Sequence, residues 1–298
     1  MKTQATPEVT KRNIYSKESH RDAFTFRELL VVLAVMGMLT VVVLPALAKS
    51  RPGGQAARCM NNLRQMMAGV LVYAGDYGDF FPPNPDDANS FFGHNWVPGN
   101  AGGAGSGVPW RPEYLADSTR CAVLNYIGAN ASLFKCPADE RVGIPSSGTY
   151  AGQRVPAPRT ISMNAVVGTV CAGFKAGFGH GGAPLFETVA PYIPVNYFRY
   201  SKVSGIVAPT PSRLWVLLDE SSIGLNDGAF AVGMTSSTWI DAPGAYHNGA
   251  GSFAFADGHF ESKKWRSEST GQRIGVIASG SPEEADYLWL RDRTSAAR

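Results

Sequence analysis

The residues best suited to do chemistry in this chain lie in its C-terminal third. His247 precedes an Asp257-Gly258 pair, and the hydroxyl of Ser252 lies between them in the sequence. A histidine base oriented by a carboxylate, with a hydroxyl nucleophile, would make a hydrolase. The chain, however, has no Gly-x-Ser-x-Gly motif, and Asp-Gly has a sufficient role in a tight turn. We therefore predict that His247 makes a structural hydrogen bond, that no residue is catalytic and that the protein is not an enzyme.

A second group of polar residues offers oxygen ligands. Asp219, Glu220, Asn226 and Asp227 lie on either side of a short apolar segment. Calcium prefers such oxygen atoms, usually six to eight of them. The spacing is not that of an EF-hand, and acidic loops are commonly solvated turns. We predict no cofactor, and bound calcium stays an alternative.

The four cysteines are a third candidate group. Their positions are 59, 121, 136 and 171, and this spacing matches no known pattern of zinc ligands, so we predict no metal. If the domain lies outside the cytoplasm, at least one pair is expected to form a disulfide, and four cysteines allow three pairings. The alternative is that some are small buried apolar residues.

The element that dominates the N-terminus is an uncharged apolar segment. It runs from Leu29 to Ala48, directly after Glu28. As a helix it would be roughly 30 Å long, which is the thickness of the hydrocarbon core of a bilayer. The pattern predicts a transmembrane helix. It is compatible with an uncleaved anchor or with a secretory signal cleaved after Ala46-Leu47-Ala48.

An amphipathic helix is expected to follow. Between Gln55 and Tyr73 the apolar residues recur at helical spacing. Pro52-Gly53-Gly54 stands before this segment, and we predict a hinge at 52–54 because proline and glycine weaken helices.

The rest of the chain shows short strand patterns. Apolar runs at 214–218 and 252–256, and the Asp257-Gly258 turn leading to 259–265, predict an antiparallel sheet with a hairpin. Helices are expected over 113–126, ending near Gly128, and over 282–292, where Ser281 begins a capping box. The predicted fold class is α+β, with a long N-terminal transmembrane and stem helix packed on an antiparallel sheet.

Phe24-Thr25-Phe26-Arg27-Glu28, followed by the apolar segment, resembles the type IV prepilin signal. The resemblance implies cleavage between Ala23 and Phe24 by a prepilin peptidase and methylation of Phe24. It also implies a helix-kinking role for Pro45 and docking of Glu28 onto a neighbouring pilin-like subunit. Arg27, and Ala23 in place of the usual glycine, depart from the family pattern.

Further segments resemble a large family of bacterial pilin-like proteins. These segments are Cys59-Met60-Asn61-Asn62-Leu63-Arg64-Gln65, Phe134-Lys135-Cys136-Pro137-Ala138-Asp139, Ser162-Met163-Asn164, Asn226-Asp227-Gly228-Ala229-Phe230 and the His247-X9-Asp257-Gly258 motif. The resemblance extends over nearly the whole chain. It implies a pseudopilin-like subunit of a type II secretion or type IV pilus-like assembly.

Together these patterns predict a leader at 1–23, a transmembrane helix at 24–51, a stem at 52–74 and a head at 75–298. The expected location is the bacterial inner membrane, crossed once, with the head outside the cytoplasm. Expected partners are membrane lipid, other pilin-like subunits and the prepilin peptidase. A net charge of +3 with 17% charged residues gives no basic surface for nucleic acid.

Two other functions are compatible with the sequence. A tethered carbohydrate-binding or recognition module would use the aromatic residues Phe91, Phe92, Trp96 and Trp110. An anchored hydrolase would use His247 and Asp257.

Overall fold

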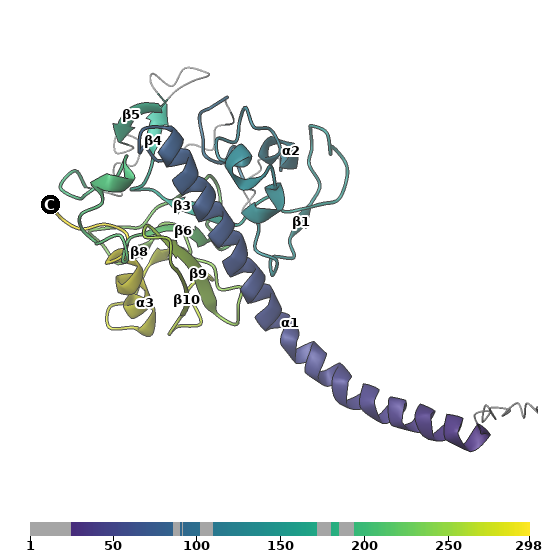
Figure 1. The fold of residues 1–298 in the computed structure, drawn as a ribbon. Coiled ribbons are helices and arrows are strands. Elements are labelled where there is room, and N and C mark those ends of the chain that lie inside the picture. The colour runs from purple at the N-terminus through teal and green to yellow at the C-terminus, as the bar shows by residue number, and fades with distance from the viewer. Residues whose placement is uncertain (1–24, 86–89, 91, 102–109, 172–179, 185–193) are drawn as a thin grey trace, which may run out of the picture. The chain divides into compact units, whose positions relative to one another are not determined.

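The computed structural model describes residues 25–85, 90, 92–101, 110–171, 180–184 and 194–298 (Figure 1). For 40–53, 170–171 and 180–184 it describes the backbone alone. The chain divides into two compact units, Met1–Lys49 and Ser50–Arg298.

Helix α1 spans Phe26–Asp76. It continues through Pro52, Gly53 and Gly54, so the predicted hinge at 52–54 is wrong. In a helix interior proline costs about 3 kcal/mol and each glycine about 1 kcal/mol relative to alanine, whereas the flanking alanine, arginine and glutamine residues favour helix. These local penalties do not end the helix here.

The structure also contradicts the predicted membrane span. In the part of the chain that is described, no helix combines the length and apolarity needed to cross a bilayer. The predictions of a transmembrane helix at 24–51 and of a single-pass inner-membrane location are therefore wrong.

The centre of the second unit is a five-stranded sheet with the order β10-β9-β6-β3-β7. Its strands are β3 (Ile161–Asn164), β6 (Trp215–Asp219), β7 (Ala229–Phe230), β9 (Ala250–Phe255) and β10 (Phe260–Lys264). β7 pairs with β3 in parallel, and the other neighbours are antiparallel. The sheet is mixed and most described elements are short strands, so the predicted fold class is wrong. The parallel pairing joins segments that are distant in sequence, which no local pattern indicates.

Four predicted features of this unit are confirmed. β6 and β9 lie where the apolar runs predicted strands, and Asp257-Gly258 forms the turn between β9 and β10, with Gly258 at φ 88°. Helix α3 (Pro282–Arg291) begins at Ser281, whose side chain accepts a hydrogen bond from the amide of Glu284.

The helix predicted over 113–126 is wrong. The structure has a short α2 (Pro112–Leu115) and a 3₁₀ turn at Leu124–Ile127, which ends at Gly128 as expected. The turn around Asp117 interrupts the helix, because the Asp117 carboxylate accepts hydrogen bonds from the amide and hydroxyl of Thr119.

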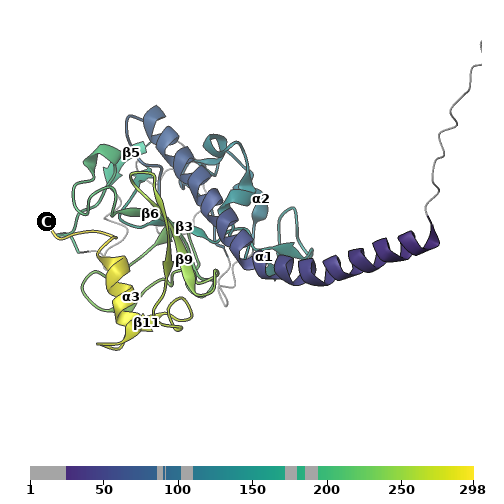
Figure 2. The ribbon, with the colours of Figure 1, turned by 60° about the horizontal axis from the view of Figure 1, so that its bottom comes forward.

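Helices α1 and α3 cover opposite faces of the sheet (Figures 1 and 2). Adjacent residues of a strand point to opposite faces. On β9, the Ser252 side chain lies near Cys59 of α1, whereas the Phe253 ring lies 5.2 Å from the Trp289 ring of α3. The buried stripe of α1 that enters this core consists of Leu63, Met66, Met67 and Val70.

Smaller pairings complete the described fold. Three two-stranded sheets pair β1 (Val142–Gly143) with β2 (Val155–Pro156), β4 (Thr169–Cys171) with β5 (His180–Pro184), and β8 (Thr238–Trp239) with β11 (Gly275–Val276). Further 3₁₀ turns lie at Ala131–Phe134 and Val203–Gly205.

Candidate functional site

Four buried side chains converge inside the second unit. The ligand-type atoms of Cys59, Cys136, Asp219 and His247 all lie within 4.8 Å of one another. Cys136 Sγ is 3.3 Å from His247 Nε2, and Asp219 Oδ2 is 3.9 Å from both Cys59 Sγ and His247 Nε2. The first three residues are 0% exposed and His247 is 9% exposed. We call this group the Cys-Asp-His cluster.

Each member of the cluster comes from a different element. Cys59 is on the buried face of α1, and Asp219 is the last residue of β6. Cys136 follows the 3₁₀ turn at Ala131–Phe134 and donates its amide to Thr160 Oγ1 at 2.7 Å. His247 lies in the turn that leads into β9. The cluster therefore joins the helix, the central strand and two loops.

Burial and mutual contact shift the pKa of every member. A hydrogen bond from Cys59 lowers the pKa of Cys136 to about 5, while the same contact and burial raise the pKa of Cys59. Burial raises the pKa of Asp219 to about 7. Burial opposes protonation of His247, but the hydrogen bond to Cys136 raises its pKa overall. These shifts arise because burial disfavours charged groups, whereas hydrogen bonds and neighbouring charges favour particular charged forms.

The geometry does not match a catalytic triad. In a triad the nucleophile and the carboxylate contact different nitrogens of the histidine. Here Nε2 of His247 faces both Cys136 Sγ and Asp219 Oδ2. One nitrogen thus lies near both the thiol and the carboxylate, so the histidine does not relay between them.

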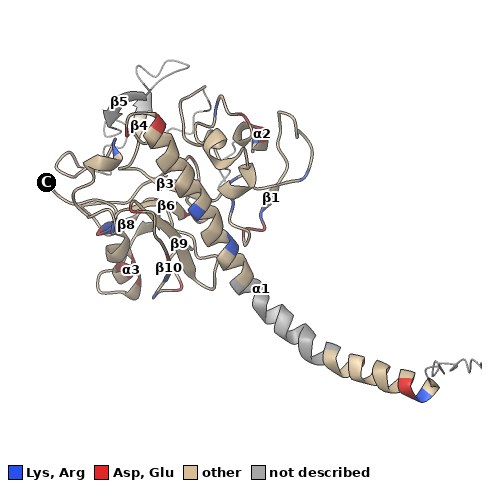
Figure 3. Ribbon diagram, in the orientation of Figure 1, with Lys and Arg blue, Asp and Glu red and all other residues tan. Residues whose placement is uncertain are grey.

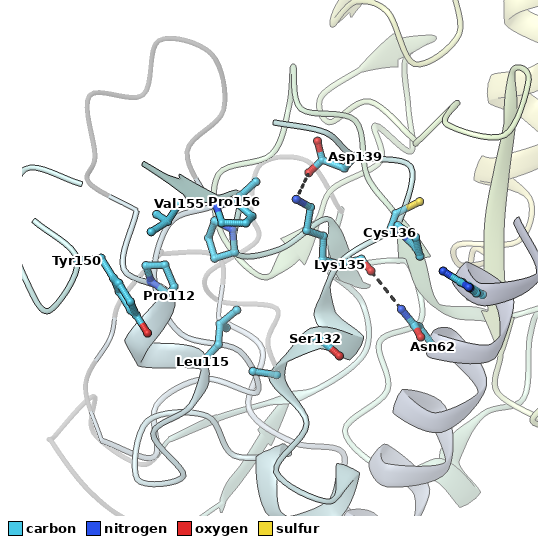
Figure 4. A pocket seen from close by; sticks show the side chains of 15 residues that line it. Asn62, Pro112, Leu115, Ser132, Lys135, Cys136, Asp139, Tyr150, Val155 and Pro156 are labelled. Carbon is cyan, nitrogen blue, oxygen red and sulfur yellow. Dashed lines mark hydrogen bonds and ion pairs between the residues drawn. The ribbon is translucent and has the colours of Figure 1, made fainter. Parts of the chain in front are cut away.

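A cavity of about 670 Å³ lies beside the cluster and has Cys136 in its wall (Figure 4). Its apolar lining includes Leu115 and Tyr150. Figure 4 shows Lys135 reaching Asp139, 4.0 Å away, beside the Cys136 end of the cavity.

The residues predicted to act in processing and assembly lie in or near the first unit. Ala23 and Phe24 are outside the described residues, and Pro45 lies in α1 with its side chain outside them. Glu28 is exposed in the first turn of α1, where its Oε2 accepts the amide and hydroxyl of Thr25, each at 2.8 Å. These hydrogen bonds lower the pKa of Glu28. Glu28 thus forms a capping box with Thr25.

The Cys59 to Gln65 motif faces two environments. Cys59 and Leu63 are buried, and Asn62 donates to the Lys135 carbonyl at 3.2 Å. On the outside, the Arg64 guanidinium lies 5.1 Å from the ring centre of Phe260. On the same side, the exposed Gln65 side chain donates to the carbonyl of Asn61, which is also exposed, at 3.4 Å. Pro137, next to Cys136, accepts a hydrogen bond from Gln55 at 3.5 Å.

His247 and Asp257, the two ends of the His-X9-Asp-Gly motif, do not form a pair. His247 belongs to the cluster, whereas Asp257 Oδ1 lies 2.5 Å from His259 Nδ1 in the exposed β9–β10 turn. The two residues expected to form a hydrolytic dyad thus have separate structural partners.

The suggested calcium ligands are divided between two sites. Asp219 faces the cluster, whereas Glu220 accepts a hydrogen bond from Ser162 on the other side of the strand. Asp227 accepts the amide of Ala229 at 2.8 Å, and the carbonyl of Asn226 accepts from the buried Arg159.

The aromatic residues suggested for recognition are also in different places. Trp96 is 0% exposed and donates to the Gly228 carbonyl at 3.1 Å. Phe92 is 43% exposed under the guanidinium of Arg120, and Trp110 is partly buried. Phe91 lies outside the described residues.

The sequence did not indicate the Cys-Asp-His cluster, because its members are too far apart for any spacing pattern. The available signal was that three of the family-like segments each carry a potential metal ligand: Cys59, Cys136 and His247. Cys59, Cys121 and Cys136 are free thiols, and the side chain of Cys171 is outside those described.

No family model matches this chain, and no match is found among curated proteins or solved structures.

Proposed function

We propose that this protein is a structural subunit that assembles with copies of itself through the N-terminal part of helix α1. The observation that carries the proposal is a helical segment with apolar side chains exposed around its circumference. Its exposed fractions range from 42% at Val32 to 75% at Met38. A helix that is apolar on all sides is normally buried, and large exposed apolar surfaces mark interaction sites.

The charges of this segment favour a second copy as the occupant. Between positions 26 and 48 the charged residues are Arg27 and Glu28, in the first turn (Figure 3). In a parallel bundle Arg27 of one copy lies beside Glu28 of the next. The Glu28 carboxylate can accept an arginine as well as Thr25, because its oxygens have several acceptor sites.

Two further points support a structural role. His247 and Asp257 have separate partners, as described above. Residues 24–28 and the later segments resemble pilin-like subunits, which act by helix packing. This resemblance also supports a structural role.

The oligomeric state of the full chain tests the proposal. We expect a concentration-dependent oligomer in sedimentation velocity, and its loss in a Leu33→Glu Val35→Glu variant, because buried charges oppose helix packing. The matched control is Val276→Glu, which places a charge at an apolar position of the head that is 77% exposed. A monomeric wild-type chain, or an oligomer that survives the double substitution, would contradict the proposal.

A further inference from the structure

We propose that the Cys-Asp-His cluster binds one zinc ion, with Cys59 Sγ, Cys136 Sγ, Asp219 Oδ2 and His247 Nε2 as its four ligands. This inference is independent of self-assembly through α1.

The distances match a tetrahedral zinc site. Zinc lies about 2.3 Å from thiolate sulfur and about 2.0–2.2 Å from imidazole nitrogen or carboxylate oxygen. Ligand atoms at the corners of such a tetrahedron are therefore about 3.4–3.8 Å apart. The observed separations are 3.3 Å between Cys136 and His247 and 3.9 Å from Asp219 to Cys59 and to His247. The other three separations are within 4.8 Å, so shifts of up to about 1 Å would complete the site.

The donor set selects the metal. Two thiolates and one imidazole suit zinc, and a carboxylate is a common fourth ligand. Calcium and magnesium prefer sites made of oxygen atoms, and this cluster has a single carboxylate. Two thiolates and a carboxylate carry three negative charges, and a divalent cation offsets most of that charge in a buried site.

Neighbouring groups hold the ligands in place. Asp219 Oδ1 accepts the Ser252 amide at 2.6 Å, which leaves Oδ2 directed at the cluster. The backbone amide of Ala138 stabilises the Cys136 thiolate, and Thr160 holds the amide of Cys136 itself. Such contacts around the ligands orient them and tune metal affinity.

The site is closed, which indicates a structural ion. Four protein ligands fill a tetrahedral shell, whereas catalytic zinc keeps a position for water or substrate. The four residues are buried and come from α1, β6 and two loops. An ion bound here would cross-link the helix to the sheet and to the loop that carries Cys136.

Metal content of the full chain tests the inference. Protein produced with added zinc and then desalted is expected to carry one zinc per chain by plasma mass spectrometry. Single substitutions Cys59→Ser, Cys136→Ser and His247→Ala are each expected to lower zinc affinity by about tenfold or more. Cys121→Ser is the matched control: this buried thiol hydrogen-bonds to the Trp96 carbonyl, and burial raises its pKa to about 12.

A second measurement uses the wild-type chain alone, so that it does not depend on the folding of a variant. After removal of zinc, cobalt(II) is expected to produce the visible absorption of a tetrahedral thiolate centre, and X-ray absorption of the zinc form to show two sulfur and two lighter ligands. Absence of zinc and cobalt binding would overturn the inference. So would unchanged affinity in the ligand variants, or a Cys59–Cys136 disulfide in protein purified without reductant.

Discussion

Gly244 lies directly against Asp219. Its amide donates to the Asp219 carbonyl at 2.7 Å, and a methyl group added at Gly244 would lie 2.8 Å from the Asp219 side-chain Cγ. The backbone at Gly244 thus packs directly against the Asp219 carboxyl group. A residue larger than glycine at 244 would push the Asp219 side chain or its own backbone out of place.

We expect Gly244→Ala to lower the free energy of unfolding by about 1–3 kcal/mol, because overpacking a buried site forces the backbone or the Asp219 side chain to move. Urea denaturation would measure the change. Gly75→Ala is the control, since nothing lies within 4 Å of the added methyl group and alanine favours helix. Equal free energies of unfolding for Gly244→Ala and the wild type would contradict the prediction, because the added methyl group would then fit without overpacking.

Zinc is expected to stabilise the head. For an ion that binds only the folded chain, free zinc at 100 times the dissociation constant raises the free energy of unfolding by about 2.7 kcal/mol. Urea denaturation with a chelator and with buffered zinc would show the difference. The zinc-dependent increase in unfolding free energy is expected to be unchanged in Cys121→Ser and to be lost in Cys136→Ser. A stability that is indifferent to zinc in the wild type would argue against a structural ion.

Trp96 is expected to act in packing, because it is 0% exposed and its indole donates to Gly228. We predict that Trp96→Ala lowers the free energy of unfolding by about 3–5 kcal/mol. Phe92→Ala, at a partly exposed ring, is expected to have a much smaller effect. Saturable glycan binding that Trp96→Ala abolishes without loss of stability would instead favour the recognition function.

Asp79 is expected to contribute to stability above acidic pH. Its carboxylate accepts the hydroxyl and the amide of Ser204, and these hydrogen bonds lower its pKa below the ordinary 3.8. A lowered folded pKa means that the contribution is present above 3.8 and is lost as the pH falls through the lower value. The effect is small because the group is near solvent.

Asp79→Asn is a suitable variant for this test, since asparagine tolerates the positive φ of 75° at this position. The difference in unfolding free energy between the wild type and Asp79→Asn should shrink as the pH is lowered from 6 to 3. A difference that stays constant over this range would exclude the carboxylate as its source.

Local patterns predicted the elements whose structure depends on nearby residues. The apolar run before Asp219 predicted β6, Asp257-Gly258 predicted a hairpin and Ser281 predicted the start of α3. The stripe from Cys59 to Leu71 predicted the buried face of α1. In each case the signal lies within a few residues of the feature.

Features that depend on distant residues were not predicted. The parallel pairing of Met163 with Ala229 and the Cys-Asp-His cluster result from tertiary contacts. The sequence around each cysteine of the cluster is like that around a buried apolar residue. Only the fold shows that these two cysteines lie close together. The apolar segment that begins at Leu29 predicted a membrane span, and that prediction is wrong.

The order in which the cluster residues occur along the chain has a consequence for biosynthesis. Cys59 and Cys136 leave the ribosome well before Asp219 and His247, and the central strand β6 is made late as well. Until then the nascent polypeptide carries two thiols without their final neighbours, and the apolar stripe of α1 has no sheet to cover it. Translation beyond His247 is thus required before all four residues of the cluster can meet.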